Sequence, residues 1–402
     1  MTPRRQSRRA PVTSPAAATV FTTVLTQGPV SRVDVARRTG LSSAAVTKAA
    51  RPLIEAGYLA ELDSEQGGVG RPASPLEIRA EREFFLGIKI TDRELVGVVT
   101  DLRAQVLLTR FHPLSSCKLD AVVDGVAAMV TELLAESKSY KQRTHCLGVT
   151  IAGDVDRESG HVRYSPFLHW RDVPLADLLA EKVDLEITVD NDVKAITVAE
   201  RWFGNGIGAD SFALVTLGTG IGCGLVVNGR VVTGSHGVAG EIGHIPVFGD
   251  GPLCHCGATG CVEAIASTDA IVDQARTTTG ERDLTIDEVI TGARMGDEAL
   301  RRVFARAGVA IGRGLAAMAN LVGPERIIVS GEGLDAYDLF AAEIRETFGT
   351  QAFGAAAHCE LILRPLPFEE WARGAAAIAV QTLFLSATTP GAVWGQPSPT
   401  RR

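Results

Sequence analysis

The fold of this chain is decided by LGTGIGCGLVVNGRVVTG at Leu217–Gly234, GEIGHIP at Gly240–Pro246 and CHCGATGCVE at Cys254–Glu263. The apolar runs on either side of Gly218–Gly222 predict two strands joined by a tight glycine turn. Such a turn brings bare backbone N–H groups together, as phosphate-binding loops do, although a glycine loop alone is a weak signal. The cysteine-rich segment is the more specific signal.

This cysteine-rich segment predicts a metal site. Three of the seven cysteines fall within eight residues, and with one histidine they make four suitable ligands within eighteen residues. A Cys₃His set suits a tetrahedral zinc ion, and Gly257 and Gly260 permit the sharp turns that a closed loop needs. Because no position is left for water, we expect a structural zinc; the alternative is three reduced cysteines without a metal. The expected ligands are His244, Cys254, Cys256 and Cys261.

Length and composition bound the class of protein. At 402 residues the chain suits two or three domains, and its 46% hydrophobic and 22% charged residues are ordinary for a globular protein. No apolar run approaches the roughly 18–20 residues that span a bilayer, and no apolar segment follows the basic N-terminus as in a secretory signal. We therefore expect a cytoplasmic protein with no membrane partner and with reduced cysteines.

The net charge of −7 hides an asymmetry along the chain. Residues 1–52 contain nine basic side chains and one acidic side chain, so this segment carries +8 and the remaining 350 residues carry −15. A basic head on an acidic body is typical of a polyanion-binding module joined to a body with another task. We expect residues 1–14 to form a flexible basic arm and residues 15–80 to bind double-stranded DNA.

The pattern of residues 15–80 predicts a winged helix-turn-helix. Turn and cap residues divide it into three short helices, the third of which begins after Ser42. The strand-like stretches YLAEL at 58–62 and PLEIR at 75–79 follow as the wing. The third helix of such a motif enters the major groove, and an arginine at the wing tip reaches the minor groove. The alternative is an interaction module of the same shape. The expected DNA-binding residues are Ser42, Ser43, Thr47, Lys48 and Arg71.

From Phe84 the periodicity changes to strands alternating with helices. Three strands are expected in FFLGIKI, ELVGVVTD and QVLLTRFH, followed by a helix and the strand CLGVTIAG. A second half repeats this theme, from FALVTLGTG to RIIVSGEG. Two such αβ halves predict two lobes that flank a cleft.

Together these motifs resemble the ROK family, which comprises repressors, open reading frames and kinases. YSPFLHWRDVPL at 164–175 and VDNDVKAITVAERWFG at 189–204 also fit, as does the winged helix at 15–80, so the resemblance covers almost the whole chain. It implies an α/β protein in which a two-lobed, actin-like and RNase H-like sugar-kinase fold occupies residues 81–385 as the effector and dimerisation domain. The composition of residues 386–402 predicts a disordered tail.

The resemblance also implies a sugar site beside the expected metal. In the family the second nitrogen of the zinc-binding histidine contacts a sugar hydroxyl, and two glutamates accept hydrogen bonds from other hydroxyls, as suits carboxylates. An aspartate after the strand LEITV matches the general base of the kinases, and the asparagine before it matches a sugar contact. The alternatives are surface charges for the glutamates and a helix cap for the Asn-Asp pair. The expected sugar-binding residues are Asn191, Asp192, Glu241, His244 and Glu263.

The first phosphate-binding loop departs from the kinase pattern. Where the kinases carry Asp-x-Gly-Gly-Thr, this chain has KITDR at Lys89–Arg93, so side chains replace bare backbone and Asp92 adds a negative charge. Glu332 stands at a position that is usually glycine in the adenosine segment, and Phe167 stands where an asparagine is common on the sugar side. We expect no phosphoryl transfer and no catalytic residue, with Asp192 as a vestigial base.

These features predict a DNA-binding transcriptional regulator of carbohydrate metabolism whose operator affinity changes when a monosaccharide or sugar phosphate binds. They favour a repressor over an activator. We expect a homodimer or homotetramer, because reading two half-sites needs two heads. The alternatives are an active ROK sugar kinase with an accessory DNA-binding head and a constitutive DNA-binding protein whose large domain only dimerises. Which sugar binds, and whether it releases or promotes DNA binding, is left open.

Overall fold

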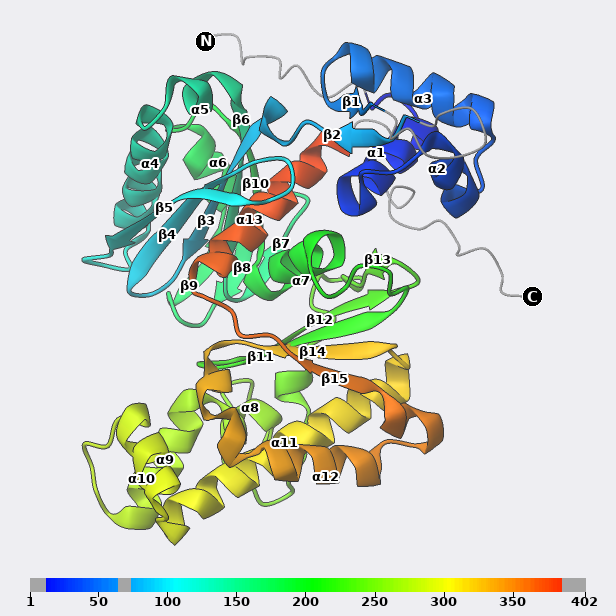
Figure 1. The fold of residues 1–402 in the computed structure, drawn as a ribbon. Helices are drawn as coiled ribbons and strands as arrows, with labels where there is room; N and C mark the ends of the chain where they lie inside the picture. The colour runs from blue at the N-terminus through cyan, green and yellow to red at the C-terminus, as the bar shows by residue number, and fades with distance from the viewer. Residues whose placement is uncertain (1–11, 64–73, 385–402) are drawn as a thin grey trace. The chain divides into compact units, whose positions relative to one another are not determined.

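The computed structural model describes residues 12–63 and 74–384 of the chain. The first eleven residues of the expected arm, Arg71 at the expected wing tip and the expected tail lie outside these ranges. The chain divides into two compact units, drawn in Figure 1 and treated separately below. Unit 1 comprises Met1–Gly208, Asn228–Arg230 and Pro367–Arg402, and unit 2 comprises Ala209–Val227 and Val231–Leu366.

Unit 1 begins with the three helices and the hairpin that the sequence predicts. The helices are α1 (Pro15–Gln27), α2 (Arg32–Thr39) and α3 (Ser43–Glu55), and the antiparallel hairpin is β1 (Leu59–Glu61) with β2 (Leu76–Ile78). This order of helices followed by a two-stranded hairpin is the winged helix-turn-helix arrangement.

Serine side chains start all three of these helices. Ser14, Ser31 and Ser42 each accept a hydrogen bond from the backbone N–H three residues further on, which satisfies a donor that the first helical turn leaves free. The apolar faces of the helices meet around Phe21 and Leu53, both fully buried. The cap at Ser42 is the one that the sequence predicts.

The rest of unit 1 is built on a five-stranded sheet in the order β10-β6-β3-β4-β5 (Figure 1). Strands β3, β4 and β5 pair antiparallel, whereas β6 and β10 extend the sheet in parallel. Helix α4 packs against β4, and helix α13 packs against β3 and β6 on the opposite face. The strands are β3 (Phe84–Ile90), β4 (Glu94–Thr100), β5 (Val106–Pro113), β6 (Thr144–Ile151) and β10 (Glu186–Asn191). The helices are α4 (Leu119–Ala135), α5 (Lys138–Arg143), α6 (Leu175–Ala180), α7 (Asp192–Phe203) and α13 (Glu369–Gln381).

A small antiparallel sheet that the sequence analysis does not predict follows β6. Its strands are β7 (Asp154–Asp156), β8 (His161–Ser165) and β9 (Trp170–Val173), in the order β7-β8-β9. The connection between β8 and β9 carries Phe167, whose side chain is exposed.

Unit 2 repeats the strand order of unit 1. Its sheet runs β13-β12-β11-β14-β15, so in each unit the first strand lies between the second and fourth strands of that sheet. This repetition is the two-lobed actin-like arrangement that the sequence predicts. The strands are β11 (Phe212–Leu217), β12 (Ile221–Val227), β13 (Arg230–Val231), β14 (Arg326–Ser330) and β15 (Glu360–Leu363). The helices are α8 (Val262–Ala266), α9 (Thr268–Thr279), α10 (Ile286–Met295), α11 (Glu298–Val322) and α12 (Ala341–Gln351).

Short 3₁₀ segments complete the chain. They are η1 (Ala80–Arg82), η2 (Ile242–His244), η3 (Glu332–Leu339), η4 (Gly354–His358) and η5 (Thr382–Phe384). Across the described parts of both units, no helix combines the length and the apolar character needed to cross a bilayer.

Candidate functional site

The four predicted metal ligands lie together in unit 2. The ligand atoms of the histidine at the end of η2 and of the three cysteines all lie within 4.8 Å of one another. The Nδ1 atom of His244 lies 3.5 Å from the Sγ atom of Cys254, and the Sγ atoms of Cys256 and Cys261 lie 3.7 Å apart. Three thiols and one imidazole nitrogen converging at this distance form a cluster that could hold one metal ion.

Backbone turns close the loop that carries the three cysteines. The N–H of Cys254 donates to the carbonyl of Ala258 over 2.8 Å, and Gly257 and Gly260 take positive φ values of 92° and 72° that favour glycine. Burial raises the pKa of the Cys261 thiol to about 12. Without a cation this burial favours the neutral thiol, whereas a bound cation would favour the thiolate by its own charge, so this donor set can hold a metal ion.

Glu263 is held beside this cluster at the start of α8. Its Oε2 atom accepts a hydrogen bond from the backbone N–H of Ile221 at 2.9 Å, and its Oε1 atom lies 3.2 Å from Nδ1 of His255. The ring of His255 packs edge-on against that of His244, with centroids 4.8 Å apart. The structure therefore brings together His244 and Glu263, two of the predicted sugar-binding residues. The sequence analysis missed His255, whose position inside the Cys-x-Cys pair was the available signal.

Glu241 lies immediately before η2, where its side chain is exposed. Burial and, to a lesser extent, the charge of Glu241 raise the pKa of the buried Cys223 thiol. Three of the predicted sugar-binding residues, Glu241, His244 and Glu263, thus belong to unit 2. Asn191 and Asp192 belong to unit 1.

Asp192, the predicted vestigial base, is buried at the first position of α7 and is already paired. Its Oδ2 atom accepts a hydrogen bond from the ammonium group of Lys89, and its Oδ1 atom accepts one from the backbone N–H of Val193 at 2.9 Å. The ammonium group also lies 5.4 Å from the ring centre of Trp371. The ammonium group of Lys89 thus compensates the charge of the buried Asp192 carboxylate.

Asn191 caps α7, which is the alternative to a sugar contact that the sequence analysis left open. Its Oδ1 atom accepts from the N–H of Lys194 at 3.1 Å, and its Nδ2 atom donates to the carbonyl of Gly153 at 3.0 Å. The preceding Asp190 is buried, which raises the pKa of its carboxyl, and Arg157 lies 3.2 Å from it. Charged groups from β3, from the connection between β7 and β8 and from the end of β10 therefore gather around the start of α7.

Helix α3 presents two different faces. One face packs into the core of the winged helix-turn-helix of residues 15–80, which is called the head below. The other face, with the predicted DNA-binding residues, is exposed. The buried residues are Val46, Ala49, Ala50 and Leu53. The exposed ones are Ser42, Ser43, Thr47 and Lys48. Hydroxyl and ammonium groups on a free helix face are suited to phosphates and base edges.

Residues 85–382 match a family model described as the ROK family. The chain belongs to the ROK family. It is 28% identical over 346 residues to the DNA-binding transcriptional dual regulator NagC of Escherichia coli K12, a match that covers 84% of this chain and 85% of NagC.

Two solved ROK structures match different shares of this chain. A ROK family transcriptional regulator, a homologue of the E. coli MLC protein, is 26% identical with a TM-score of 0.78, and the match covers 92% of this chain and 96% of that one. A ROK glucokinase from Streptomyces griseus, solved with glucose and AMPPNP, is 29% identical with a TM-score of 0.65. This second match covers 99% of the glucokinase but 74% of this chain. The regulator therefore matches more of the chain than the kinase does.

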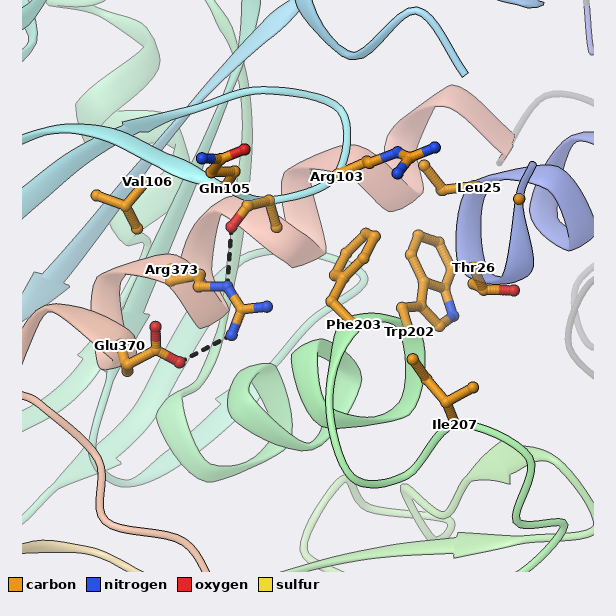
Figure 2. Close-up of a pocket in the computed structure, with 12 residues that line it drawn as sticks. Leu25, Thr26, Arg103, Gln105, Val106, Trp202, Phe203, Ile207, Glu370 and Arg373 are labelled. Atoms are coloured by element: carbon orange, nitrogen blue, oxygen red, sulfur yellow. Dashed lines mark hydrogen bonds and ion pairs between the residues drawn. The ribbon is translucent and has the colours of Figure 1, made fainter. Parts of the chain in front are cut away.

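A pocket of about 470 Å³ lies within unit 1, where the head contacts the first lobe of the ROK fold (Figure 2). The ends of α1, α7 and α13 line it, with the rings of Trp202 and Phe203 beside Leu25. On its other side Arg373 donates to the carbonyl of Ala104 and pairs with Glu370, each over 2.8 Å. The pocket is separate from the predicted sugar-binding residues.

Proposed function

We propose that this ROK protein is a transcriptional regulator of carbohydrate metabolism, which binds operator DNA through its winged helix and senses a sugar without phosphorylating it. The observation that carries the proposal is the buried ion pair between Lys89 and Asp192. A general base must take up a proton, and a carboxylate that does so beside a buried ammonium group leaves that charge without compensation. The pair therefore opposes phosphoryl transfer.

The sugar-sensing part of the proposal rests on the chemistry beside the metal cluster. Carboxylates accept hydrogen bonds from hydroxyl groups, so Glu241 and Glu263 of unit 2 are suited to bind a monosaccharide or sugar phosphate. We infer that the metal is a structural zinc held by the Cys₃His set, since this ligand set is complete without water. The zinc would fix the ring of His244 and leave its second nitrogen for a sugar hydroxyl.

The DNA-binding part rests on α3 and on the likeness to NagC, which is itself named as DNA-binding. Ser42, Ser43, Thr47 and Lys48 would contact the major groove, and Arg71 the minor groove. Two such heads in a homodimer or homotetramer would read the two halves of an operator. A sugar that prefers one arrangement of the ROK domain would then change the operator affinity by linkage.

The DNA contact is tested by removing one charge from α3. Lys48→Ala is expected to weaken binding to genomic operator fragments about tenfold and to lower the salt dependence of the binding constant by about one ion, because one phosphate contact is lost. The matched control is Lys141→Ala, which removes the same charge from α5, outside the head. Equal operator affinity of the Lys48 and Lys141 variants across a salt series would contradict the assignment of α3.

The sugar response is tested with a panel of monosaccharides and their phosphates in a gel-shift assay. The panel contains xylose, glucose and N-acetylglucosamine. It also contains xylose 5-phosphate and the 6-phosphates of the other two sugars. We expect at least one of them to change the operator affinity and to raise the melting temperature, since a ligand of the folded state stabilises it. If no sugar in the panel changes the operator affinity or the melting temperature, the protein is not a sugar sensor. ATP-dependent turnover of a sugar in a coupled assay would support the kinase alternative instead.

A further inference from the structure

The glycine loop of unit 2 has a carboxylate of its own chain against it. The loop Gly218–Gly222 joins β11 to β12, and the Oε1 atom of Glu332 accepts hydrogen bonds from the backbone N–H of Thr219 at 3.0 Å and from its hydroxyl at 3.3 Å. A Cβ atom at Gly218 would collide with the same carboxylate. A negative group therefore occupies the place where a bare glycine loop receives an anion.

The backbone after β14 directs Glu332 to this place. Gly331 has a φ of 97°, and a Cβ atom there would collide with the carbonyl oxygen of Leu217. A Cβ atom at Gly333 would lie 3.0 Å from the same oxygen. Because glycines on both sides let the chain pass directly against the end of β11, the side chain between them reaches the loop. The contact is thus determined by backbone geometry as well as by the side-chain rotamer.

A second amide of the same loop also has an internal partner. The N–H of Ile221 donates to Glu263 at 2.9 Å, so donors on either side of Gly220 already bind carboxylates of this chain. Carboxylates are strong acceptors for backbone N–H groups, and a phosphate would have to displace them.

The first loop, in unit 1, follows the same principle with a hydroxyl group. The Oγ1 atom of Thr91 accepts from the backbone N–H groups of Arg93 at 3.2 Å and of Glu94 at 2.9 Å. It also donates to the carbonyl of Glu94 at 2.8 Å. This turn satisfies its own donors, as serine and threonine turns do.

We infer that Glu332 is a selectivity residue that takes the anion position of the glycine loop and excludes phosphate-bearing ligands from it. A phosphate brought to Thr219 would lie beside the carboxylate, and like charges so close to each other repel. Unit 2 thereby keeps the loop as a structural turn and as a donor to Glu263, without an anion-binding role. The inference rests on contacts within unit 2 and is independent of DNA and sugar binding.

Titration of the full chain with tripolyphosphate and with magnesium ADP, followed by calorimetry, tests this inference. Glu332→Ala frees the N–H and the hydroxyl of Thr219 and removes the charge, so it is expected to bind tripolyphosphate at least about tenfold more tightly than the parent protein. Glu332→Gln should bind tripolyphosphate with an intermediate affinity, because its amide oxygen still accepts a hydrogen bond from Thr219 but carries no charge. Glu346→Ala is the matched control, since it removes an exposed charge from α12.

Hydrogen exchange of the peptide that contains the loop provides the second readout. In the Glu332→Ala variant the amide of Thr219 should exchange faster, and tripolyphosphate should slow it again, whereas the parent protein should not respond. If the alanine variant gains no affinity for tripolyphosphate, with or without a loss of thermal stability, Glu332 is only a structural clamp and the inference is wrong. Equally tight binding by the parent protein would overturn it as well.

Discussion

Lys89 and Asp192 form a buried pair in which each charge compensates the other. Removing one partner leaves an isolated charge that is largely shielded from water, which typically costs about 3–5 kcal/mol. We therefore expect Lys89→Met to lower the free energy of unfolding by that amount, measured by urea denaturation, and Lys89→Met with Asp192→Asn to recover part of the loss. The control is Lys182→Met, which breaks the exposed pair with Asp124 and should cost under about 1 kcal/mol. Equal losses in the two single variants would refute the burial argument.

Glu83 is a buried ionisable group just before β3, the first strand of the unit 1 sheet. It is 4% exposed, and its burial raises the carboxyl pKa from 4.5 to about 7, although a hydrogen bond with Tyr58 opposes the shift. The folded state therefore holds this proton more tightly than the unfolded state does. Between pH 4.5 and pH 7 the folded protein keeps a proton that the unfolded chain has released, so stability falls as the pH rises through this range.

Glu83→Gln removes this pH-dependent cost. The gap between the two pKa values corresponds to roughly 3 kcal/mol, so the variant should be more stable than the parent protein by up to about this amount at pH 8 and by little at pH 4.5. Thermal and urea unfolding at several pH values measure the difference. Glu81→Gln, at an exposed position two residues earlier, should change stability equally little at both pH values. A stabilisation of Glu83→Gln that does not grow with pH would contradict the prediction.

At the scale of elements, the sequence predicted those structures whose signals are local. The three capped helices of the head and the long apolar strands of both sheets each carry their own periodicity. The strands β7, β8 and β9 have three to five residues, too few for an alternating pattern to stand out. Glu332 and Thr219 lie 113 positions apart in the chain. The sequence therefore indicated that Glu332 replaces a usual glycine, but it did not indicate which residue Glu332 contacts. The same holds for Lys89 and Asp192, 103 positions apart.

Helix α13 shows how strongly one element depends on residues far away in the chain. It crosses the sheet of unit 1 at Gly148 and Gly87, where a Cβ atom would collide with the backbone of Ala375 and Ala372, respectively (Figure 1). Gly148→Ala must therefore push the helix from the sheet, and we expect a loss of about 3 kcal/mol in urea unfolding. Gly349→Ala, in α12 with no described atom within 4 Å of its new Cβ, should be neutral or stabilising by up to about 1 kcal/mol. Similar losses for both variants would argue against close approach as the cause.

At the scale of the whole molecule, α7 connects the two activities that we propose. It begins at Asp192, in the charged network at the end of β10, and ends at Trp202 and Phe203 beside the head (Figure 2). Trp202 is 2% exposed and shares one apolar cluster with Leu25 of α1 and with the sheet of unit 1. A shift of the start of α7 on sugar binding would therefore reach the head through a packed helix rather than through a flexible linker.

This connection predicts that Trp202→Leu weakens the coupling between sugar and operator more than it weakens either binding step alone. The smaller side chain leaves space between α7 and α1, so movement at Asp192 is absorbed before it reaches the head. The measurement is the operator Kd with and without the sugar that responds in the gel-shift panel, together with the sugar Kd with and without operator. Linkage requires both ratios to shrink by the same factor, and we expect at least about fivefold. Ile207→Ala, at a half-exposed position in the same pocket, should leave both ratios near those of the parent protein. Unchanged ratios in the Trp202 variant would mean that the signal reaches the DNA by another route, such as rearrangement between subunits.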